Sequence, residues 1–559
     1  MSSSSDRKIL FGWTMLAAFV CHFLFSHLGF NIGDDGFVVA MSERILKGQF
    51  PHRDFISVRP IGSAILWAPV VAFSGKYAHI AVRFFSWIQF SLIAFFWISI
   101  NNRQWKIELS TFQSTIIHTV TLFLGSSIFT YYGWNTLDGL FFTSLGAYIY
   151  LHSNEKMIPQ LLAFLLIGLA PLFKQNFLAV IPLSYVCLCD IKKKYHLLFI
   201  SIFPSLIYLA LIRSFGGWEE MRIQFTSYTS ILGPGFFAYI QNKATHRGVI
   251  FGLLWIFSMR WMLKRPLRII EKFKAFSPLV VCAPLLLFFF YGALVWWQGK
   301  YTYKYPFTLF GFIFVLLLTF IVNEAKSKNF KNTQIALFPL GVAWVTGISG
   351  GYITPILGGA PIISLILLFS FKKIEEFNFP EKFRAREMVV VIAFFSFFPC
   401  WIYGRYNFIY GEYPASKLVH PLDGLLPGGS GLYTTKNNYL AFKSLNQIVE
   451  KYENYELALI PDYPGFWVGF HQLNPLPIDW ANVFELANPK VYERFSRELK
   501  QLSGSKNQLV VLQKFAGYTF SILGEGEVLP LHDKREFILH VQKNFTLIDE
   551  NEFFGVYRP

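Results

Sequence analysis

The chain has 559 residues, of which 53% are hydrophobic, 19% aromatic and only 15% charged, whereas soluble proteins carry about 25% charged residues. Its mean hydropathy is +0.41, and apolar runs of about 18 or more residues recur in the part before residue 405. This composition excludes a soluble multi-domain enzyme and predicts a mostly α, polytopic transmembrane helical bundle.

The formal net charge is +16, and its position along the chain decides what it means. About 36 Lys and Arg residues against about 17 Asp and Glu residues precede Tyr406, so all of the excess lies there. These cations fall in short loops between apolar runs, as at Lys192–Lys194. Basic loops of this kind mark the cytoplasmic side of a membrane protein. The charge therefore indicates topology, and we expect no nucleic-acid partner.

The first apolar run, from Ile9 to Phe30, follows Arg7 and Lys8 and lacks a small-x-small cleavage site. It predicts an uncleaved first span. With the later apolar runs it predicts about thirteen crossings. The predicted spans are 9–30, 78–100, 111–131, 137–151, 158–173, 176–189, 196–214, 246–262, 277–297, 305–322, 334–348, 361–372 and 388–405.

The basic loops all lie on the cytoplasmic side only if the apolar stretch 60–74 does not cross the membrane. If it did cross, Arg103, Lys106 and every later basic loop would face outside. Residues 31–77 therefore form one long first outer loop of juxtamembrane helices. An odd number of spans carries the chain from a cytoplasmic N-terminus to an outer C-terminus. We expect a multi-pass membrane protein whose transmembrane part covers residues 1–405.

After residue 405 the composition becomes mixed polar and apolar, which predicts a small extracytoplasmic soluble α/β domain over 406–559. Helical periodicity at 440–452 and 489–502 predicts helices, and short apolar runs at 457–460 and 509–512 predict strands.

The first outer loop is crowded with ionisable residues and begins with the adjacent carboxylates Asp34 and Asp35. Carboxylates at a membrane–water boundary can act as a general base, because partial desolvation raises the pKa toward the working pH. Alternatively, Asp34 or Asp35 caps a helix that starts near Phe37, a position that Asp fills well. The residues alone leave both interpretations open.

The order of motifs in this loop resembles the C-type glycosyltransferase superfamily, membrane enzymes that use lipid-phosphate-linked sugars and include protein O-mannosyltransferases and the bacterial aminoarabinose transferase. Their first outer loop begins with an acidic pair and often continues into a helix with a Leu-x-Gly end, a Pro-Tyr-Arg-Asp-like stretch and a basic residue before proline. The matching residues here are Asp34-Asp35, Leu46-Lys47-Gly48, Pro51-His52-Arg53-Asp54, with His52 in place of the commoner tyrosine, and Arg59-Pro60.

Two shorter sites extend the resemblance. Thr136-Leu137-Asp138 is similar to the family's entry to the fourth span, which implies that Asp138 is a further carboxylate near the reaction centre; alternatively, Asn135 caps a helix and Asp138 completes a capping box. Lys174 lies between two spans on the predicted outer side, against the charge bias, and a lipid phosphate would explain it. Snorkelling of Lys174 from a helix end is the alternative.

The resemblance implies an inverting glycosyltransferase that moves a sugar from a polyprenyl-phosphate carrier to a glycan, lipid or protein acceptor at the outer face. It implies that residues 1–405 form the transmembrane catalytic domain and that the membrane is the bacterial inner membrane. It implies catalytic roles for Asp34, Asp35 and Asp138, with Asp34 as the base. Arg59 and Lys174 would bind the phosphate. Arg53 and Asp54 are expected to bind the substrate or its phosphate as well. No cofactor is predicted with certainty, and a divalent metal stays open. The alternatives are a lipid-linked-glycan polymerase or ligase, or a glycolipid transporter or flippase.

Overall fold

The structure is a computed structural model. It describes residues 4–107, 109–126, 132–190, 193–227, 241–264, 301–326, 330–348, 398–399, 401–407, 409, 412, 414–505, 507–515 and 535–559. Most of the described part before residue 405 is helical, as predicted from the apolar runs. The long helices are α1 (Ser4–Phe25), α4 (Ala78–Trp105), α5 (Thr111–Ser126), α6 (Asn135–His152), α7 (Met157–Phe173), α9 (Tyr195–Ser214), α12 (Lys243–Lys264), α15 (Tyr301–Lys326) and α16 (Phe330–Gly347), and the shorter α8 (Val180–Leu188) lies within a further predicted span.

These helices coincide with the predicted apolar spans that fall in the described part of the chain. The predicted spans 277–297 and 361–372 lie outside the described residues, and 388–405 lies mostly outside them, so the total of thirteen is not confirmed. Within the described ranges, three segments are long and apolar enough to cross a membrane: Asp6–Phe25, Gly62–Trp105 and Tyr195–Ser214. The apolar composition and these segments identify an integral membrane protein.

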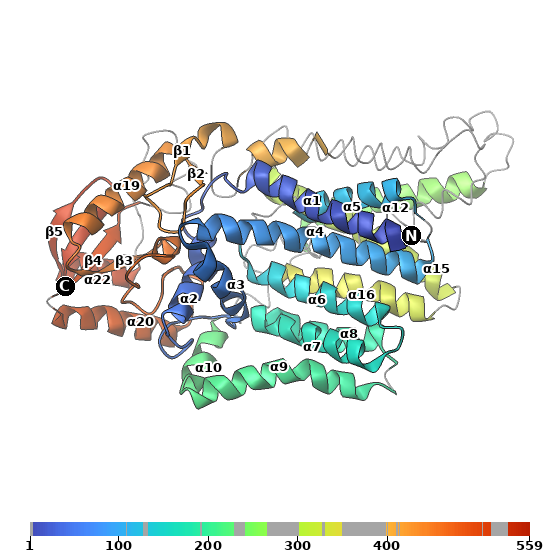
Figure 1. Cartoon of the computed structure of the whole chain (residues 1–559), viewed down its shortest axis with the longest axis horizontal. Coiled ribbons are helices and arrows are strands. Elements are labelled where there is room, and N and C mark those ends of the chain that lie inside the picture. Colours follow the sequence, from blue (N-terminus) through green and yellow to red (C-terminus); the bar gives the residue numbers. More distant parts are fainter. Residues whose placement is uncertain are drawn as a thin grey trace.

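The long helices lie side by side, with α4 between α1 and α6, and α7 between α6 and α9 (Figure 1). Two helices of the first loop, α2 (Asp34–Leu46) and α3 (Gly62–Ser74), lie at the end of this bundle that faces the C-terminal sheet. We call it the sheet end. The 13 residues of α3 span only about 20 Å, which is shorter than the roughly 30 Å of a bilayer's hydrocarbon core.

Helix α2 ends at the predicted Leu46-Lys47-Gly48 step. Gly48 has a φ of 81°, a left-handed conformation that glycine adopts without strain. Its N–H donates to the carbonyl of Ile45, and the N–H of Gln49 donates to that of Arg44, both at 3.0 Å. These bonds satisfy carbonyls that would otherwise lack partners at the helix end.

The C-terminal region contains a four-stranded mixed sheet in the order β3-β4-β6-β5. Strands β3 (Glu456–Ile460) and β4 (Gln508–Gln513) are parallel, while β5 (Thr546–Glu550) and β6 (Phe554–Arg558) extend the sheet in antiparallel pairings. A separate two-stranded pair joins β1 (His420–Pro421) to β2 (Tyr433–Thr434). The structure confirms the predicted strands at 457–460 and 509–512.

Helices cover both faces of this sheet, and alternation along each strand determines which helix each residue meets. Leu457 and Leu459 pack with α19 (Lys436–Lys451), whereas Ala458 and Ile460 pack with α20 (Pro489–Gln501) and α22 (Glu536–Asn544). Helices α19 and α20 are those predicted at 440–452 and 489–502.

Helix α2 is held tightly against the C-terminal region. Gly36 lies so close to Gly465, in the short helix η5 (Pro464–Trp467), that a methyl group at Gly36 would overlap the Gly465 backbone. Arg44 forms a buried pair with Asp479, with Nε donating to Oδ2 at 2.7 Å and Nη2 to Oδ1 at 2.6 Å. The first loop and the C-terminal region therefore pack as one unit.

Candidate functional site at the sheet end of the bundle

The first carboxylate of the acidic pair lies at the start of α2. The helix begins at Asp34, three residues earlier than the predicted start near Phe37. Its turn is closed by Asn31, whose Oδ1 accepts from the N–H of Gly33 at 3.0 Å and of Asp34 at 2.8 Å. Because Asn31 supplies this side-chain acceptor, the capping interpretation does not account for Asp34, which is half-buried.

Asp35 points in another direction and is buried. Its Oδ2 accepts from Nη2 of Arg83 and from the N–H of Asn31, each at 2.8 Å. Arg83 also donates to the carbonyls of Ser26 at 2.6 Å and Gly29 at 2.7 Å. Burial raises the pKa of Asp35, and the charge of Arg83 lowers it. Asp35 thus fastens the segment after α1 to α4.

Arg59 joins the first loop to the C-terminal region. Its Nη1 lies 2.8 Å from Oε1 of Glu485, and its guanidinium carbon lies over the ring of Phe37, 5.0 Å from the centroid. The Glu485 side chain is only 1% exposed, whereas that of Arg59 is 17% exposed. Burial raises the pKa of Glu485, the nearby Arg59 lowers it, and the charge of Asp34 raises it. Asp34, Arg59 and Glu485 are therefore electrostatic neighbours.

Lys174 lies between α7 and the short helix η2 (Gln175–Ala179), and it is buried rather than extended to solvent as snorkelling would require. Its Nζ donates to Oγ1 of Thr136 at 3.1 Å. Burial lowers the pKa of Lys174 well below its ordinary value, and the positive charge of Arg59 lowers it further. Lys174 therefore lies within electrostatic range of Arg59. Its hydrogen bond to Thr136 connects it to the predicted motif Thr136-Leu137-Asp138.

Asp138 is fully buried in the first turn of α6. Its Oδ1 accepts from Nε2 of Gln89 on α4 at 2.8 Å, and its Oδ2 accepts from Nε1 of Trp67 on α3 at 3.1 Å. The alternative interpretation, a capping box, is not formed, because the Asn135 side chain donates to the Phe173 carbonyl at 3.1 Å and no side chain caps the start of α6. Asp138 connects three helices beneath the site.

Arg53 and Asp54 form an ion pair with each other, with Nε of Arg53 2.7 Å from Oδ1 of Asp54. The preceding His52 has a φ of 66° and is buried between Gln224, at 2.7 Å, and Tyr208, at 2.6 Å. Burial lowers the pKa of His52 to about 4, so the ring is neutral at physiological pH. This turn contacts α9 and α10 (Trp218–Thr226).

Three predicted residues, Asp34, Arg59 and Lys174, lie in one part of the structure. Arg59 lies over the ring of Phe37 in the helix that Asp34 begins, and Nε2 of Gln175, the neighbour of Lys174, donates to the carbonyl of Val58, the neighbour of Arg59, at 2.6 Å. Asp35, Asp138 and the Arg53–Asp54 pair have the separate partners described above. Sequence reasoning missed Glu485 and Arg83. No local pattern marks Glu485, which lies about 450 residues beyond Asp34 and reaches the site only through the packing of the C-terminal region. Thr136 was part of a recognised motif, but its bond to Lys174 was not expected.

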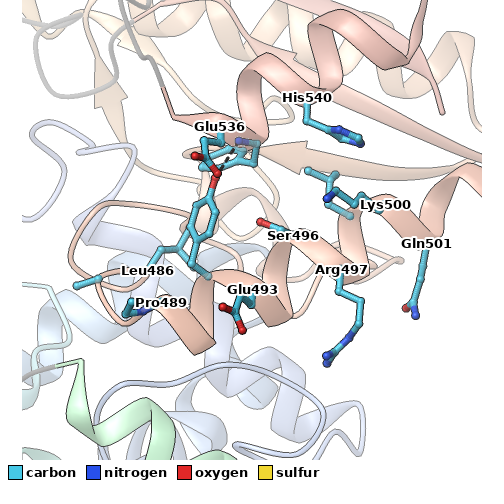
Figure 2. A pocket seen from close by; sticks show the side chains of 13 residues that line it. Leu486, Pro489, Glu493, Ser496, Arg497, Lys500, Gln501, Glu536 and His540 are labelled. Atoms are coloured by element: carbon cyan, nitrogen blue, oxygen red, sulfur yellow. Dashed lines mark hydrogen bonds between the residues drawn. The ribbon is translucent and has the colours of Figure 1, made fainter.

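Among the residues that the structure describes, no three His, Cys, Asp or Glu side chains group as a metal site. A pocket of about 1030 Å³ lies between α20 and α22. Arg497 and Lys500 line it from α20, and Glu536 and His540 from α22 (Figure 2). Its lining includes none of the predicted site residues and carries both signs of charge.

No protein-family model and no curated protein matches the sequence. Solved structures do match. ArnT from Cupriavidus metallidurans bound to undecaprenyl phosphate is 10% identical, with a TM-score of 0.47 and 97% of both chains covered. The oligosaccharyltransferase AglB from Archaeoglobus fulgidus, in complex with an inhibitory peptide and a dolichol-phosphate, is 12% identical, with a TM-score of 0.47, and covers 100% of this chain and 75% of its own. At this identity and these TM-scores, the likeness by itself assigns no activity to this chain.

Proposed function

We propose that the chain is an inverting glycosyltransferase that moves a sugar from a polyprenyl-phosphate carrier to an acceptor hydroxyl at the outer face of the membrane. The observation that carries the proposal is the position of a half-buried carboxylate, Asp34, near the guanidinium of Arg59 and the amine of Lys174 at one end of an apolar helical bundle. A carboxylate can accept the proton of an acceptor hydroxyl. A guanidinium and a protonated amine can bind the oxygens of a lipid phosphate. The motif order of the first loop supports the same reaction.

In the proposed reaction the carboxylate of Asp34 takes the proton of the acceptor hydroxyl. The acceptor oxygen attacks the anomeric carbon from the face opposite the phosphate, and the bond between that carbon and the phosphate oxygen breaks. The carrier phosphate leaves with the electron pair. The guanidinium of Arg59 stabilises the charge that develops on the phosphate, and Lys174 does so once it is protonated. Phosphate is already a good leaving group, so the step needs no strong general acid.

The other predicted carboxylates have supporting roles in this proposal. Asp35 orients the start of α2 through Arg83, and Asp138 holds α3 and α4 on α6 through Trp67 and Gln89. Neither needs to touch the substrate to act in this way. Arg53 and Asp54, at the turn beside α9 and α10, remain predicted contacts of the donor or acceptor.

The test is Asp34→Asn in the purified full chain, assayed with a panel of polyprenyl-phosphate sugars. Removing a general base costs about a hundredfold or more in turnover, while Asn preserves the volume and the local polar contacts. We therefore expect a stable protein, with an unchanged melting temperature, that binds the carrier and transfers little sugar.

Asp35→Asn is the control, and the buried pair with Arg83 gives it a different signature. It should lower the stability as well as the activity, since a buried charge without its partner costs about 3–5 kcal/mol. Full turnover by Asp34→Asn would exclude Asp34 as the base. If Asp35→Asn alone were inactive while retaining its stability, the base would be the second carboxylate of the pair.

A further inference from the structure

Glu485, in the C-terminal region, forms an ion pair with Arg59 of the first loop, and the backbone around Glu485 directs its side chain toward Arg59. Oδ1 of Asn482 accepts from the N–H of Phe484 at 2.7 Å and of Glu485 at 3.0 Å. This turn leaves Phe484 51% exposed and turns Glu485 inward. Burial of a carboxylate is costly unless a charge compensates it, and Arg59 supplies that charge.

The segment that carries Glu485 is tied down on both sides. Before it, Nε1 of Trp480 donates to Asp462 at 2.9 Å. After it, Nδ2 of Asn488 donates to Oγ1 of Thr226 at 2.6 Å and to the Ile223 carbonyl at 3.1 Å, which fastens the start of α20 to α10. The carboxylate is therefore presented to the first loop from a fixed backbone.

A second ion pair between the first loop and the C-terminal region, Arg44 with Asp479, is more completely buried than the pair of Arg59 with Glu485. The guanidinium of Arg44 is 2% exposed and donates to both oxygens of Asp479, to Gln49 and to the carbonyl of Leu476. That pair is enclosed by protein. Arg59 keeps 17% of its side chain exposed while its partner Glu485 is enclosed. Arg59 can therefore meet a ligand that Glu485 cannot reach.

We propose that Glu485 is a positioning residue for the donor phosphate: its carboxylate holds the Arg59 guanidinium over Phe37, so that the exposed side of that guanidinium faces the phosphate beside Lys174. The C-terminal region then completes the donor site instead of being an appended domain. This inference rests on the proposed function. A planar guanidinium binds phosphate oxygens through two parallel N–H groups, so its orientation affects binding. The ion pair with Glu485 and the contact with the Phe37 ring restrict that orientation.

The test is a double-mutant cycle on the full chain in detergent, with the dissociation constant of geranylgeranyl phosphate as the readout. Glu485→Gln keeps the volume and removes the charge, and it should weaken binding about fivefold or more, as expected for a disturbed charge-assisted contact. In an Arg59→Ala background the same substitution should have no further effect, because Glu485 acts only through Arg59. A merely structural role would give the same loss in both backgrounds and would overturn the proposal.

Glu493→Gln is the matched control, since Glu493 is an exposed residue of α20 in the same region; it should bind the probe as the native chain does. Should Glu485→Gln fail to fold, Glu485→Asp serves in its place, because it keeps the charge but withdraws it by one methylene group and should weaken binding to a smaller degree. Native-like binding by Glu485→Gln or, in its place, by Glu485→Asp would contradict the inference alone. Native-like binding by Arg59→Ala would contradict the proposed donor site itself.

Discussion

At the scale of single residues, the environments of the charged side chains separate those that can meet a substrate from those that hold the structure. Asp34 and Asp35 are adjacent in sequence, yet the first is half-buried and the second is enclosed with Arg83. The residues alone did not separate the two carboxylates, and only the family resemblance pointed to Asp34 as the base. The difference in burial arises from Arg83 on α4, nearly 50 residues further along. The pKa of a carboxylate depends on its burial, and burial is determined by tertiary packing rather than by local sequence.

Lys174 leads to a prediction on pH dependence. Burial and the charge of Arg59 lower its pKa well below 10.5, and a bound phosphate would raise it again. Donor binding then takes up a proton. The contribution of Lys174 is complete at pH values below the lowered pKa of the free protein, and it is lost as the pH rises through the higher pKa of the complex. The dissociation constant of geranylgeranyl phosphate should therefore increase with pH between the pKa of Lys174 in the free protein and its higher pKa in the complex.

Lys174→Met provides the comparison for this titration. It removes the ionisable group while keeping a long apolar stem, so it should bind the probe weakly at every pH and show a flatter profile. A native profile that is as flat as that of the variant would mean that Lys174 keeps one protonation state throughout, and the proposed contact with phosphate would then need another cation.

At the scale of elements, the sequence predicted what depends on local pattern. Apolar runs located the long helices, and Leu46-Lys47-Gly48 located the end of α2. Periodicity located α19 and α20. Strands β5 and β6 were missed, because Thr546–Glu550 has a mixed exposure pattern and Phe554–Arg558 lacks a clear alternation. Such edge and closing strands are defined by their pairing with β4 and each other rather than by their own sequence.

The contact between α2 and η5 gives a prediction at this scale. Gly36→Ala would place a methyl group on the backbone of Gly465, which cannot move aside as a side chain end could. We expect the substitution to lower the free energy of unfolding by about 1–3 kcal/mol, the usual cost of overpacking. Because Asp34 lies two residues away in the same helix, turnover should fall as well. Thermal unfolding in detergent and the transfer assay measure the two effects.

Gly12→Ala is the matched substitution for that experiment. Gly12 lies in α1, and a methyl group there would meet no atom within 4 Å. Alanine is the better helix former by about 1 kcal/mol, so the stability should stay equal or rise. If both variants lost the same stability, the close contact between Gly36 and Gly465 would not be the cause of the loss in Gly36→Ala.

At the scale of the whole molecule, the two ends of the bundle differ in what they carry. The proposed site, the end of α7 and the C-terminal region share the sheet end, where the Ser430 N–H also donates to the Lys76 carbonyl at 2.9 Å. At the other end, Arg103 donates to Asn154 at 2.5 Å, and Lys194 lies near the hydroxyl of Tyr150. Basic loops gather on the cytoplasmic side, so we expect the sheet end to face outside.

Cysteine labelling with a membrane-impermeant maleimide tests this orientation. Ser503 and Lys76 are exposed residues at the sheet end, and Lys193 is exposed in the basic loop before α9. Ser503→Cys and Lys76→Cys should be labelled in intact cells, whereas Lys193→Cys should be labelled only after the membrane is permeabilised. The unsubstituted chain sets the background, and its described cysteines, Cys21, Cys187 and Cys189, are buried. Labelling of Lys193→Cys in intact cells would invert the topology and place the proposed site on the cytoplasmic side. Protection of Lys76→Cys alone would instead mean that the segment before α4 does not share a side with the C-terminal region, contrary to its hydrogen bond with Ser430.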